Sequence, residues 1–406
     1  MADVMNYIDR LVAELCPDGV EYRPLGEIAD IGTGKSDKKD AQESGQYPFY
    51  VRSKTILRSS KYLYDETAIV IPGEGGVGEI FHFVSGKYDL HQRAYRVSFT
   101  VDEMNPKFGY YYISSFFKEY INRHAVEATV KSIRKPMLVK FEVPVPPLEI
   151  QEAIVEILDK FTNLEANLEA ELEARTLQYE YYRGSLFGTL KDPATGLPAI
   201  AGLVKTLCPD GVEYRSLKDV VAKNYGGGTP SKSKAEYWDG NIPWASVGDL
   251  SDDVLEVTDT RSKITEEGVK GSSTNIVPAG AVIVAIKINP GRMKIAGMNL
   301  AINQDIRGLV LNDSMNARFL TYYFRTLMFA GHGTIVKSIT NKHLMETKIP
   351  VPPMEIQQRI VDILDRFDAL TSSLSEGLPA ELAARRSQYE YYRDQLLTFP
   401  RKGENQ

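Results

Sequence analysis

Cysteine and histidine are scarce in this chain, whose 406 residues include two cysteines and five histidines. Two cysteines cannot form the set of bridges that stabilises small secreted domains, and the scattered histidines offer no cluster for a metal ion. Cys16 and Cys208 stand at the same place in two copies of one short segment. We therefore interpret them as small buried side chains at a repeated turn, and we expect neither a disulfide nor a metal site.

Long hydrophobic runs are also absent. No apolar stretch reaches the roughly 18–20 residues that a membrane-spanning helix needs. The first residues, MADVMNYIDRLVAEL, form an amphipathic segment with acidic residues and lack the basic head and apolar middle of a signal peptide. We expect a cytoplasmic protein that has no membrane partner.

An excess of positive charge is missing too, since the formal net charge at pH 7 is −6. That balance at first argues against a nucleic-acid partner. The acidic excess is local, however, because residues 147–206 hold ten acidic and five basic side chains, and residues 353–406 hold nine and seven. The other segments are close to neutral, so they can still bind DNA if their lysines and arginines face one way.

Motifs of enzymatic catalysis are lacking as well. The chain has no Asn/Asp-Pro-Pro-aromatic methylation motif, no repeated Ser/His/Asp set and no repeated carboxylate pair. ADIGTGKS at 29–36 matches a loose phosphate-loop pattern, but a polar stretch follows where a helix would have to hold phosphate. Its counterpart at 221–233 has no Gly-Lys-Ser. Nucleotide binding through GTGKS is therefore a minor alternative.

What the chain does contain is an internal repeat. The nonapeptide LCPDGVEYR occurs at 15–23 and again at 207–215. The segment 129–161 matches 335–367, and a QYEYYR segment closes both copies. The matching stretches are the edges and the predicted helices, whereas the interiors differ. We infer two modules with one architecture and two different binding specificities.

Each copy ends in a long predicted helix that follows a Pro-Pro pair, a position where proline suits the first helical turn. Apolar residues recur every three or four positions along it, which is typical of a coiled-coil seam. Two such helices in one chain can bury each other's seam, so we expect an antiparallel intramolecular pair. The predicted seam residues are Ile154, Ile157, Phe161, Leu164, Leu168, Leu172, Ile360, Ile363, Phe367, Leu370, Leu374 and Leu382.

Two further features concern the ends of these helices. The second helix carries four extra residues, which keep its apolar stripe on one face, but Gly377 and Pro379 predict a kink or a break. The start of the chain, 8–22, resembles 201–214, the segment that follows the first helix. The repeat therefore closes on itself.

These patterns predict an α+β fold: two similar mixed α/β domains, separated by a pair of long antiparallel coiled-coil helices, in a pseudo-two-fold tandem repeat. We expect a first globular domain at 1–147 and its helix with a linker at 148–200. The second globular domain is expected at 201–353, and the second helix with the C-terminal tail at 354–406.

Basic and amide side chains gather near predicted turns of both modules and alternate with aromatic residues. Glutamine and asparagine can read adenine and arginine can read guanine, while lysine holds phosphate. The candidate DNA-binding residues are Lys35, Lys38, Lys39, Arg52, Lys54, Arg58, Gln92, Arg93, Lys131, Lys232, Lys234, Lys287, Arg292, Lys294, Asn303, Gln304, Lys337 and Lys342.

The combination of motifs resembles the specificity subunit of type I restriction-modification systems. The motifs are the PxPPxxxQxxIxxxL helices with a QYxYYR end, the CPDGVEY start and the GGTPS segment with the later IPW. The resemblance covers essentially the whole chain. It implies two target recognition domains that each read one half of a split double-stranded DNA sequence, with the helical pair setting the gap.

The resemblance also implies which partners and cofactors take part. Two methyltransferase subunits, which bind S-adenosylmethionine, would dock on this chain, and restriction subunits with motor and nuclease activity would add ATP and magnesium. This chain itself would bind no cofactor and perform no catalysis. A coiled-coil scaffold that binds proteins without DNA specificity is the second alternative.

Overall fold

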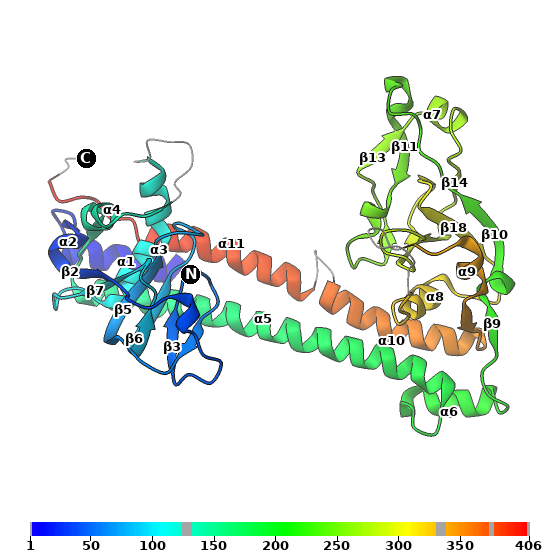
Figure 1. Cartoon of the computed structure of the whole chain (residues 1–406), viewed down its shortest axis with the longest axis horizontal. Helices are drawn as coiled ribbons and strands as arrows, with labels where there is room; N and C mark the ends of the chain where they lie inside the picture. The colour runs from blue at the N-terminus through cyan, green and yellow to red at the C-terminus, as the bar shows by residue number, and fades with distance from the viewer. Residues whose placement is uncertain (1, 124–131, 330–337, 373–376, 404–406) are drawn as a thin grey trace. The chain divides into compact units, whose positions relative to one another are not determined.

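The computed structural model describes residues 2–123, 132–329, 338–372 and 377–403 (Figure 1). The chain forms two compact units, of which unit 1 comprises residues 1–166 and 384–406 and unit 2 comprises residues 167–383. The four segments predicted above are continuous in sequence, whereas unit 1 combines two separate segments, so the predicted domain limits stay predictions. Three predicted contact or seam residues lie outside the described residues: Lys131, Lys337 and Leu374.

Unit 1 is built on a six-stranded sheet of order β2-β7-β5-β6-β3-β4, in which only the β3–β6 pair is parallel. A two-stranded sheet, β1-β8, lies beside it in the same unit. The strands are β1 Tyr22–Pro24, β2 Ala29–Thr33, β3 Tyr47–Tyr50, β4 Leu57–Ser59, β5 Tyr64–Pro72, β6 His82–Leu90, β7 Ala94–Phe99 and β8 Glu142–Pro144. The helices are α1 Ala2–Leu15, α2 Leu25–Ile28, η1 Lys38–Asp40, α3 Pro106–Arg123 and α4 Lys135–Lys140.

Unit 2 repeats this frame but divides it into the sheets β10-β18-β15-β16-β12 and β13-β11-β17-β14, with β19-β9 as the small sheet. Its strands are β9 Tyr214–Ser216, β10 Val221–Gly226, β11 Trp238–Ala245, β12 Glu256–Val257, β13 Ser262–Ile264, β14 Ile276–Val277, β15 Val282–Ala285, β16 Met293–Ala296, β17 Leu300–Ile302, β18 Ile306–Leu311 and β19 Lys348–Pro350. Its helices are α6 Pro198–Leu207, η2 Leu217–Val220, η3 Ala235–Tyr237, η4 Val247–Leu250, α7 Glu266–Lys270, α8 Ala317–Phe324, α9 Asn341–Glu346 and α10 Met354–Ser372.

The division of the sheet in unit 2 has a local cause. In unit 1 the single strand β6 pairs with both β5 and β3. In unit 2 its place is taken by two strands, because β16 pairs with β15 while β17 pairs with β11. Both units therefore keep the same pairing partners, and the tandem repeat predicted from the sequence is confirmed.

Two long helices, α5 Leu148–Lys191 and α11 Leu378–Leu396, contribute residues to both units. In unit 1 the ring of Phe161 on α5 lies 6.1 Å from each of Tyr389 and Tyr392 on α11, measured between centroids. In unit 2 the ring of Phe367 on α10 meets two tyrosines of α5 at 6.4 and 5.2 Å. Within each unit the paired helices run antiparallel, as the seam pattern predicts.

The seam itself differs in part from the predicted set. Leu168 and Leu382 are buried together with Leu378, and Leu172 packs against them. Leu164 and Leu370 are 38% and 37% exposed, so their assignment to a buried seam is wrong. An α-helix that keeps 3.6 residues per turn drifts about 20° per heptad, which turns such positions outward. Four predicted seam residues instead pack on the cores of the globular parts: Ile154, Ile157, Ile360 and Ile363.

The predicted break in the second helix is confirmed. Gly377 is not helical, and α11 begins at Leu378, with Pro379 at its second position. Proline is compatible with the first helical turn because the N–H that it lacks has no partner there.

A buried glutamine fixes the start of α5 and of α10. Gln151 is fully buried, and its Nε2 donates hydrogen bonds to the backbone oxygens of Glu103 and Pro146 at 2.7 Å each. Its Oε1 accepts the backbone N–H of Asn105 at 2.8 Å. Gln357, also fully buried, makes the same three kinds of bond in unit 2 at 2.8 Å each. Each long helix is thereby tied to the loop that precedes α3 or α8.

The closure of the repeat is visible in unit 1, where the two ends of the chain meet. The backbone N–H of Val20 donates to the Pro400 oxygen at 2.8 Å, and the Lys402 N–H donates to the Val20 oxygen at 3.0 Å. Leu396 and Phe399 join the same core as Ile8 and Leu11. In unit 2 the corresponding core contains Leu186, Phe187 and Ile200, from α5 and α6.

The duplicated nonapeptide forms the same turn twice. Cys16 and Cys208 are free, half-buried thiols, each at the end of a helix. Gly19 and Gly211 complete the turns at φ +88° and +92°, a conformation that glycine adopts without strain. Among the described residues, no helix combines the length and apolarity needed to cross a membrane, and no group of three side chains is arranged to hold a metal ion.

The glutamine bonds predict a specific loss of stability. Gln151→Ala removes hydrogen bonds to three backbone groups, one of them buried and two partly buried, so it should lower the free energy of unfolding by about 2–4 kcal/mol. Glu152→Ala changes an exposed neighbour on the same helix and should cost at most about 0.5 kcal/mol. Chemical denaturation of both variants checks this, and equal midpoints for the two would contradict the proposed role of Gln151.

Candidate nucleic-acid interface

In each unit three loops meet at the ends of the central strands, and we call this group the loop cluster. Its segments are 34–37, 73–81 and 91–93 in unit 1, and 227–234, 286–292 and 303–305 in unit 2. In unit 1 the backbone N–H of Gln92 donates to the Ser36 oxygen at 2.9 Å, and that of Gly73 donates to the Arg93 oxygen at 2.8 Å. These bonds hold the three loops together independently of their side chains.

Two backbone contacts of these loops recur in unit 2. The N–H of Ile286 donates to the Asp305 oxygen at 2.8 Å, as Gly73 does to Arg93. The N–H of Asn303 donates to the Ala245 oxygen at 3.0 Å, and in unit 1 His91 makes the equivalent bond at the same distance. The two loop clusters thus share one backbone frame, on which the side chains differ.

Most of the predicted DNA-binding residues lie on or beside these loops and are exposed. Those within or directly against the clusters are Lys35, Arg52, Gln92 and Arg93 in unit 1, and Lys232, Lys234, Lys287 and Gln304 in unit 2. The exposed candidates on neighbouring segments are Lys38, Lys39, Lys54, Arg58 and Lys342. The structure therefore brings together residues that are scattered along the sequence.

The two glutamines occupy the centre of equivalent turns. Gln92 donates from Nε2 to Asp37 at 3.2 Å. Gln304 accepts the hydroxyl of Thr229 and donates to Asp305 at 3.3 Å. Both amides are exposed but already oriented by the loop that follows β2 or β10, which lowers the entropy lost when they bind a base edge.

Asn303 was predicted to contact DNA, but it is buried, with 7% of its surface exposed, so this assignment is wrong. Its Oδ1 accepts the backbone N–H of Asp305 at 3.1 Å. His91 does the same in unit 1, where its Nδ1 accepts the N–H of Arg93 at 2.9 Å. These two side chains shape the turn rather than extend from it.

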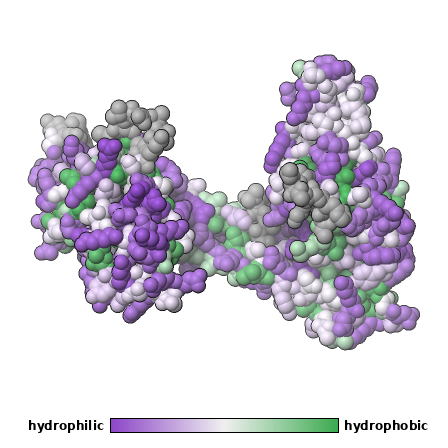
Figure 2. Space-filling view, viewed as in Figure 1, coloured by the Kyte–Doolittle hydropathy of each residue, from purple (hydrophilic) through white to green (hydrophobic). Residues whose placement is uncertain are grey.

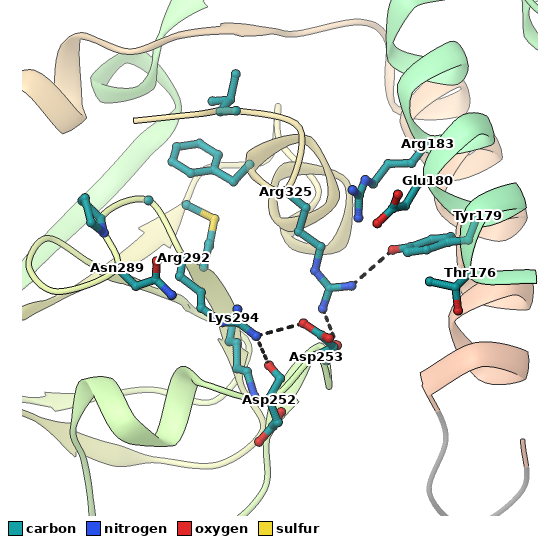
Figure 3. A pocket seen from close by; sticks show the side chains of 15 residues that line it. Thr176, Tyr179, Glu180, Arg183, Asp252, Asp253, Asn289, Arg292, Lys294 and Arg325 are labelled. Carbon is teal, nitrogen blue, oxygen red and sulfur yellow. Dashed lines mark hydrogen bonds and ion pairs between the residues drawn. The ribbon is translucent and has the colours of Figure 1, made fainter. Parts of the chain in front are cut away.

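Two other candidates, Arg292 at the end of the 286–292 segment and Lys294 on β16, are paired with aspartates. The Lys294 side chain is 3% exposed and forms an ion pair with Asp252, so its assignment as a DNA contact is corrected. Arg292 bonds the backbone of the 250–252 segment and pairs with Asp253 at 2.9 Å. Figure 3 shows both side chains turned toward these aspartates. In the sequence Lys294 lies close to a predicted turn, which made it a candidate for DNA contact. Only the fold shows that it belongs to the buried strand β16.

These residues line a polar cavity of about 420 Å³ between the second globular part and α5 in unit 2 (Figure 3). Arg325 crosses it, with its Nη1 3.2 Å from both the Tyr179 hydroxyl and an Asp368 oxygen. Because Arg292, Lys294 and Arg325 already have carboxylate partners, a small anion would have to displace those pairs. The cavity is accordingly a polar contact with the helix and a poor ligand site.

The GTGKS segment does not form a phosphate loop. The Ser36 hydroxyl donates to the buried carboxylate of Asp89 at 2.8 Å, so it is not available to a nucleotide-bound metal ion. The segment leads into η1, a helix of three residues, and a longer helix is needed to hold phosphate at its N-terminus. Lys35 is exposed beside this segment and stays a candidate for DNA contact.

Two acidic residues of the loop clusters that pair with candidate cations, Glu74 and Asp305, were not themselves candidates. Glu74 accepts hydrogen bonds from Arg93 and Arg52 at 2.9 Å each, and the bond from Arg93 is the main cause that lowers the pKa of Glu74 below its ordinary value. Asp305 lies 2.8 Å from the Lys287 ammonium. A search for basic and amide side chains passes over both acids. Comparing the two copies position by position would have shown both acidic residues, because each pairs with an arginine or a lysine.

The family model described as "Type I restriction modification DNA specificity domain" matches the chain twice, at residues 17–174 and 209–384. The type I restriction enzyme EcoR124I/EcoR124II specificity subunit of Escherichia coli is 30% identical, and the match covers 98% of each chain. A putative type I restriction enzyme specificity subunit of Haemophilus influenzae is 25% identical, over 94% of this chain and 96% of that one.

Solved structures give the same fold. The S subunit of a type I restriction-modification system from M. genitalium is similar with a TM-score of 0.55 and 17% identity, covering 93% of this chain and 95% of that one. A chain from a structure describing complex assembly and conformational transition of the type I R-M system has a TM-score of 0.58 and 18% identity, covering 93% and 97%. At such identity these two likenesses concern the fold alone.

The turn at His91 predicts a pH dependence of stability. Burial, assisted by Arg52, lowers the pKa of His91 below its ordinary value. As the pH falls below about 6.5 the unfolded chain binds the proton first, so the stability contributed by neutral His91 is present above that pH and is lost below it. His91→Asn supplies the acceptor that unit 2 uses at Asn303 and removes the titration.

The measurement is the melting temperature at about pH 7.5 and about pH 5.5. We expect a smaller decrease on acidification for His91→Asn than for the unchanged chain. Burial also lowers the pKa of His82, and this residue accounts for part of the decrease in melting temperature that His91→Asn retains. Parallel decreases in the two proteins would contradict the assignment of His91 as a neutral acceptor.

Proposed function

Because this chain belongs to the family of type I restriction-modification DNA specificity proteins, we propose that its two loop clusters read the two halves of a bipartite DNA target. The chain is a specificity subunit with two target recognition domains, and it is the non-catalytic component of a methyltransferase complex. The observation that carries the proposal is the repeated frame: equivalent backbone hydrogen bonds, from Gly73 and Ile286 and from His91 and Asn303, support loops whose exposed side chains differ. Such a pair of sites suits two unlike half-sites.

The chemistry of the loop clusters fits direct contact with base edges. Gln92 and Gln304 offer the paired donor and acceptor that read adenine, and Arg93 offers the fork that reads guanine. The lysines around them can hold phosphate and fix the position of the domain on the duplex. The exposed candidates for phosphate contact are Lys35, Lys38, Lys39, Lys54, Lys232, Lys234 and Lys342.

The helices are the proposed spacer between the half-sites. α5 contributes residues to both units, and each unit contains its own antiparallel contact between long helices. The helical segments also carry the acidic excess of the chain, which suits a protein partner better than DNA. We therefore assign them the gap length and the docking of other subunits.

Docking of two copies of one partner is supported by exposed apolar residues that occur in repeat-related pairs. Leu164 and Leu370 are 38% and 37% exposed, and Tyr181 and Tyr391 are 65% and 60% exposed. Hydrophobic residues show on the surface of the helical segments in Figure 2. Equivalent apolar residues in both copies suit two identical proteins, and we propose two methyltransferase subunits as these proteins.

The cofactors of the reactions are proposed to bind elsewhere in the complex. S-adenosylmethionine would be bound by the methyltransferase subunits, and ATP and magnesium by the restriction subunits. The target is chromosomal and invading DNA, so we propose the cytoplasm as the compartment. The alternative of a protein scaffold without DNA specificity has no explanation for the loop clusters, whose side chains differ on a shared frame.

The test of this function is methylation of a randomised duplex library by the purified complex of this chain with its methyltransferase subunits. We expect the methylated molecules to share a motif of two short, unlike segments with a gap of constant length. Affinity for that motif should fall steeply as salt rises, since counterions are released on binding. Methylation without a common motif would contradict the proposal and favour the scaffold.

The paired apolar residues give a prediction for docking. Leu164→Asp together with Leu370→Asp should weaken loading of the methyltransferase subunits about tenfold or more without lowering the melting temperature, because both side chains are exposed. Ala166→Asp adds the same charge on the opposite face of α5 and serves as the control. Analytical ultracentrifugation reports the subunit ratio, and unchanged loading by the double variant would contradict this docking surface.

A further inference from the structure

The two loop clusters contain one ion pair whose charges are exchanged between the copies. Glu74 and Lys287 are equivalent because they form the same isolated bridge, to Ser132 and Ser338 respectively. The residues that follow them, Gly75 and Ile288, share an unusual φ of +70° and +69°. The backbone therefore places an acid in unit 1 where it places a base in unit 2.

The opposite side of the pair shows the reverse exchange. Arg93 and Asp305 are equivalent because each carbonyl oxygen accepts a hydrogen bond of 2.8 Å, from Gly73 and Ile286. The Arg93 guanidinium lies 2.9 Å from Glu74. In unit 2 the Lys287 ammonium lies 2.8 Å from Asp305. One contact is thus kept in both units with its polarity inverted.

In both ion pairs the basic residue is the more exposed partner. The side chains of Arg93 and Arg52 are 58% and 42% exposed, against 37% for Glu74, which holds both. In unit 2 the Lys287 side chain is 48% exposed and that of Asp305 is 15% exposed. In each pair the acidic side chain is less exposed than its cationic partner and holds that cation toward solvent. Inversion of the pair therefore moves the outward cation from the 91–93 turn in unit 1 to the 286–292 loop in unit 2.

We propose that this exchanged pair determines specificity: Arg93 and Lys287 contact base edges from opposite sides of a shared frame, with Glu74 and Asp305 as their positioning residues. The inference rests on the proposed DNA-reading function and names residues that make the half-sites unlike. The central glutamine of the turn is the same in both units, Gln92 and Gln304, so the difference between the domains at this point lies in the pair that flanks it.

The chemistry of the two cations supports different contacts. Arg93 uses one nitrogen for Glu74, and a guanidinium has five N–H donors, so a planar fork stays available for the O6 and N7 of guanine. Lys287 presents a compact ammonium with three donors and no planar preference. Stability of the loops does not account for the inversion, since either polarity would stabilise them equally.

The experiment inverts the unit 2 pair in the complete complex. Lys287→Glu with Asp305→Arg gives unit 2 the polarity of unit 1, and Lys287→Glu alone places two acids together as the unpaired control. The readout is the motif methylated in a randomised duplex library by the complex with its methyltransferase subunits. The double variant should melt within about 2 °C of the unchanged protein, because the pair is restored.

We expect the motif of the double variant to change at one or two base pairs of one half-site. Discrimination at those positions should shift roughly ten- to hundredfold, the range that one good base contact provides. The other half-site should be unchanged. The mirror variant, Glu74→Lys with Arg93→Asp, should change only that other half-site.

Three results would decide against the idea in different ways. An unchanged motif in both double variants would overturn the pair as a specificity determinant and leave the proposed function standing. Equal weakening for all sequences would also overturn it, since it would show contact with phosphate only. Absence of any common motif with the unchanged chain would instead overturn the proposed function. If a double variant does not fold, Arg93→Lys and Lys287→Arg preserve both pairs and should alter base tolerance in the same half-sites.

Discussion

The buried amides of Gln151 and Gln357 are the constraint on which each half of this protein depends. Each joins the first turn of α5 or α10 to the loop before α3 or α8 through two hydrogen bonds, and a third bond goes to Pro146 or Pro352 just before its own helix. A buried amide tolerates no other direction, because any rotation of the helix would leave several polar groups without partners. The long helix and the sheet of each unit are therefore held in one orientation, and the loop clusters are carried on a defined support.

On this support the chain separates what must be constant from what can vary. Two backbone hydrogen bonds that join these loops recur in both units at equal distances, 2.8 Å from Gly73 and Ile286 and 3.0 Å from His91 and Asn303. Side chains that point outward from these loops differ, and the exchange of Glu74 and Arg93 for Lys287 and Asp305 is the clearest case. Recognition can change without refolding when the frame is made of main chain, because substitutions at exposed loop positions cost little stability. The overall negative charge is compatible with DNA binding because the acidic excess lies on the helices.

The sequence predicts the tandem repeat, the antiparallel helix pair, the break near Pro379 and the closure of the two chain ends, since all of these leave matching segments or periodic patterns. It places Gln92, Arg93 and Lys287 near turns, and the structure brings them into the loop clusters. It fails where burial is decided by tertiary packing. Leu164 has seam spacing yet faces outward, and Lys294 is basic yet buried against Asp252. Glu74 was not among the candidates because the role of an acidic residue in this loop depends on which arginine or lysine it pairs with, and that pairing is decided by the fold.

The central claim is that paired helices determine the separation at which two unlike loop clusters read DNA. The most direct test lengthens both helices by seven residues, or two turns, at the facing Leu168–Leu172 and Leu378–Leu382 segments. Seven helical residues add about 10 Å, which equals about three base pairs of duplex. We expect the complex to methylate a motif with both half-sites unchanged and a gap longer by about three base pairs. A longer helix pair with an unchanged gap, or with altered half-sites, would contradict the account.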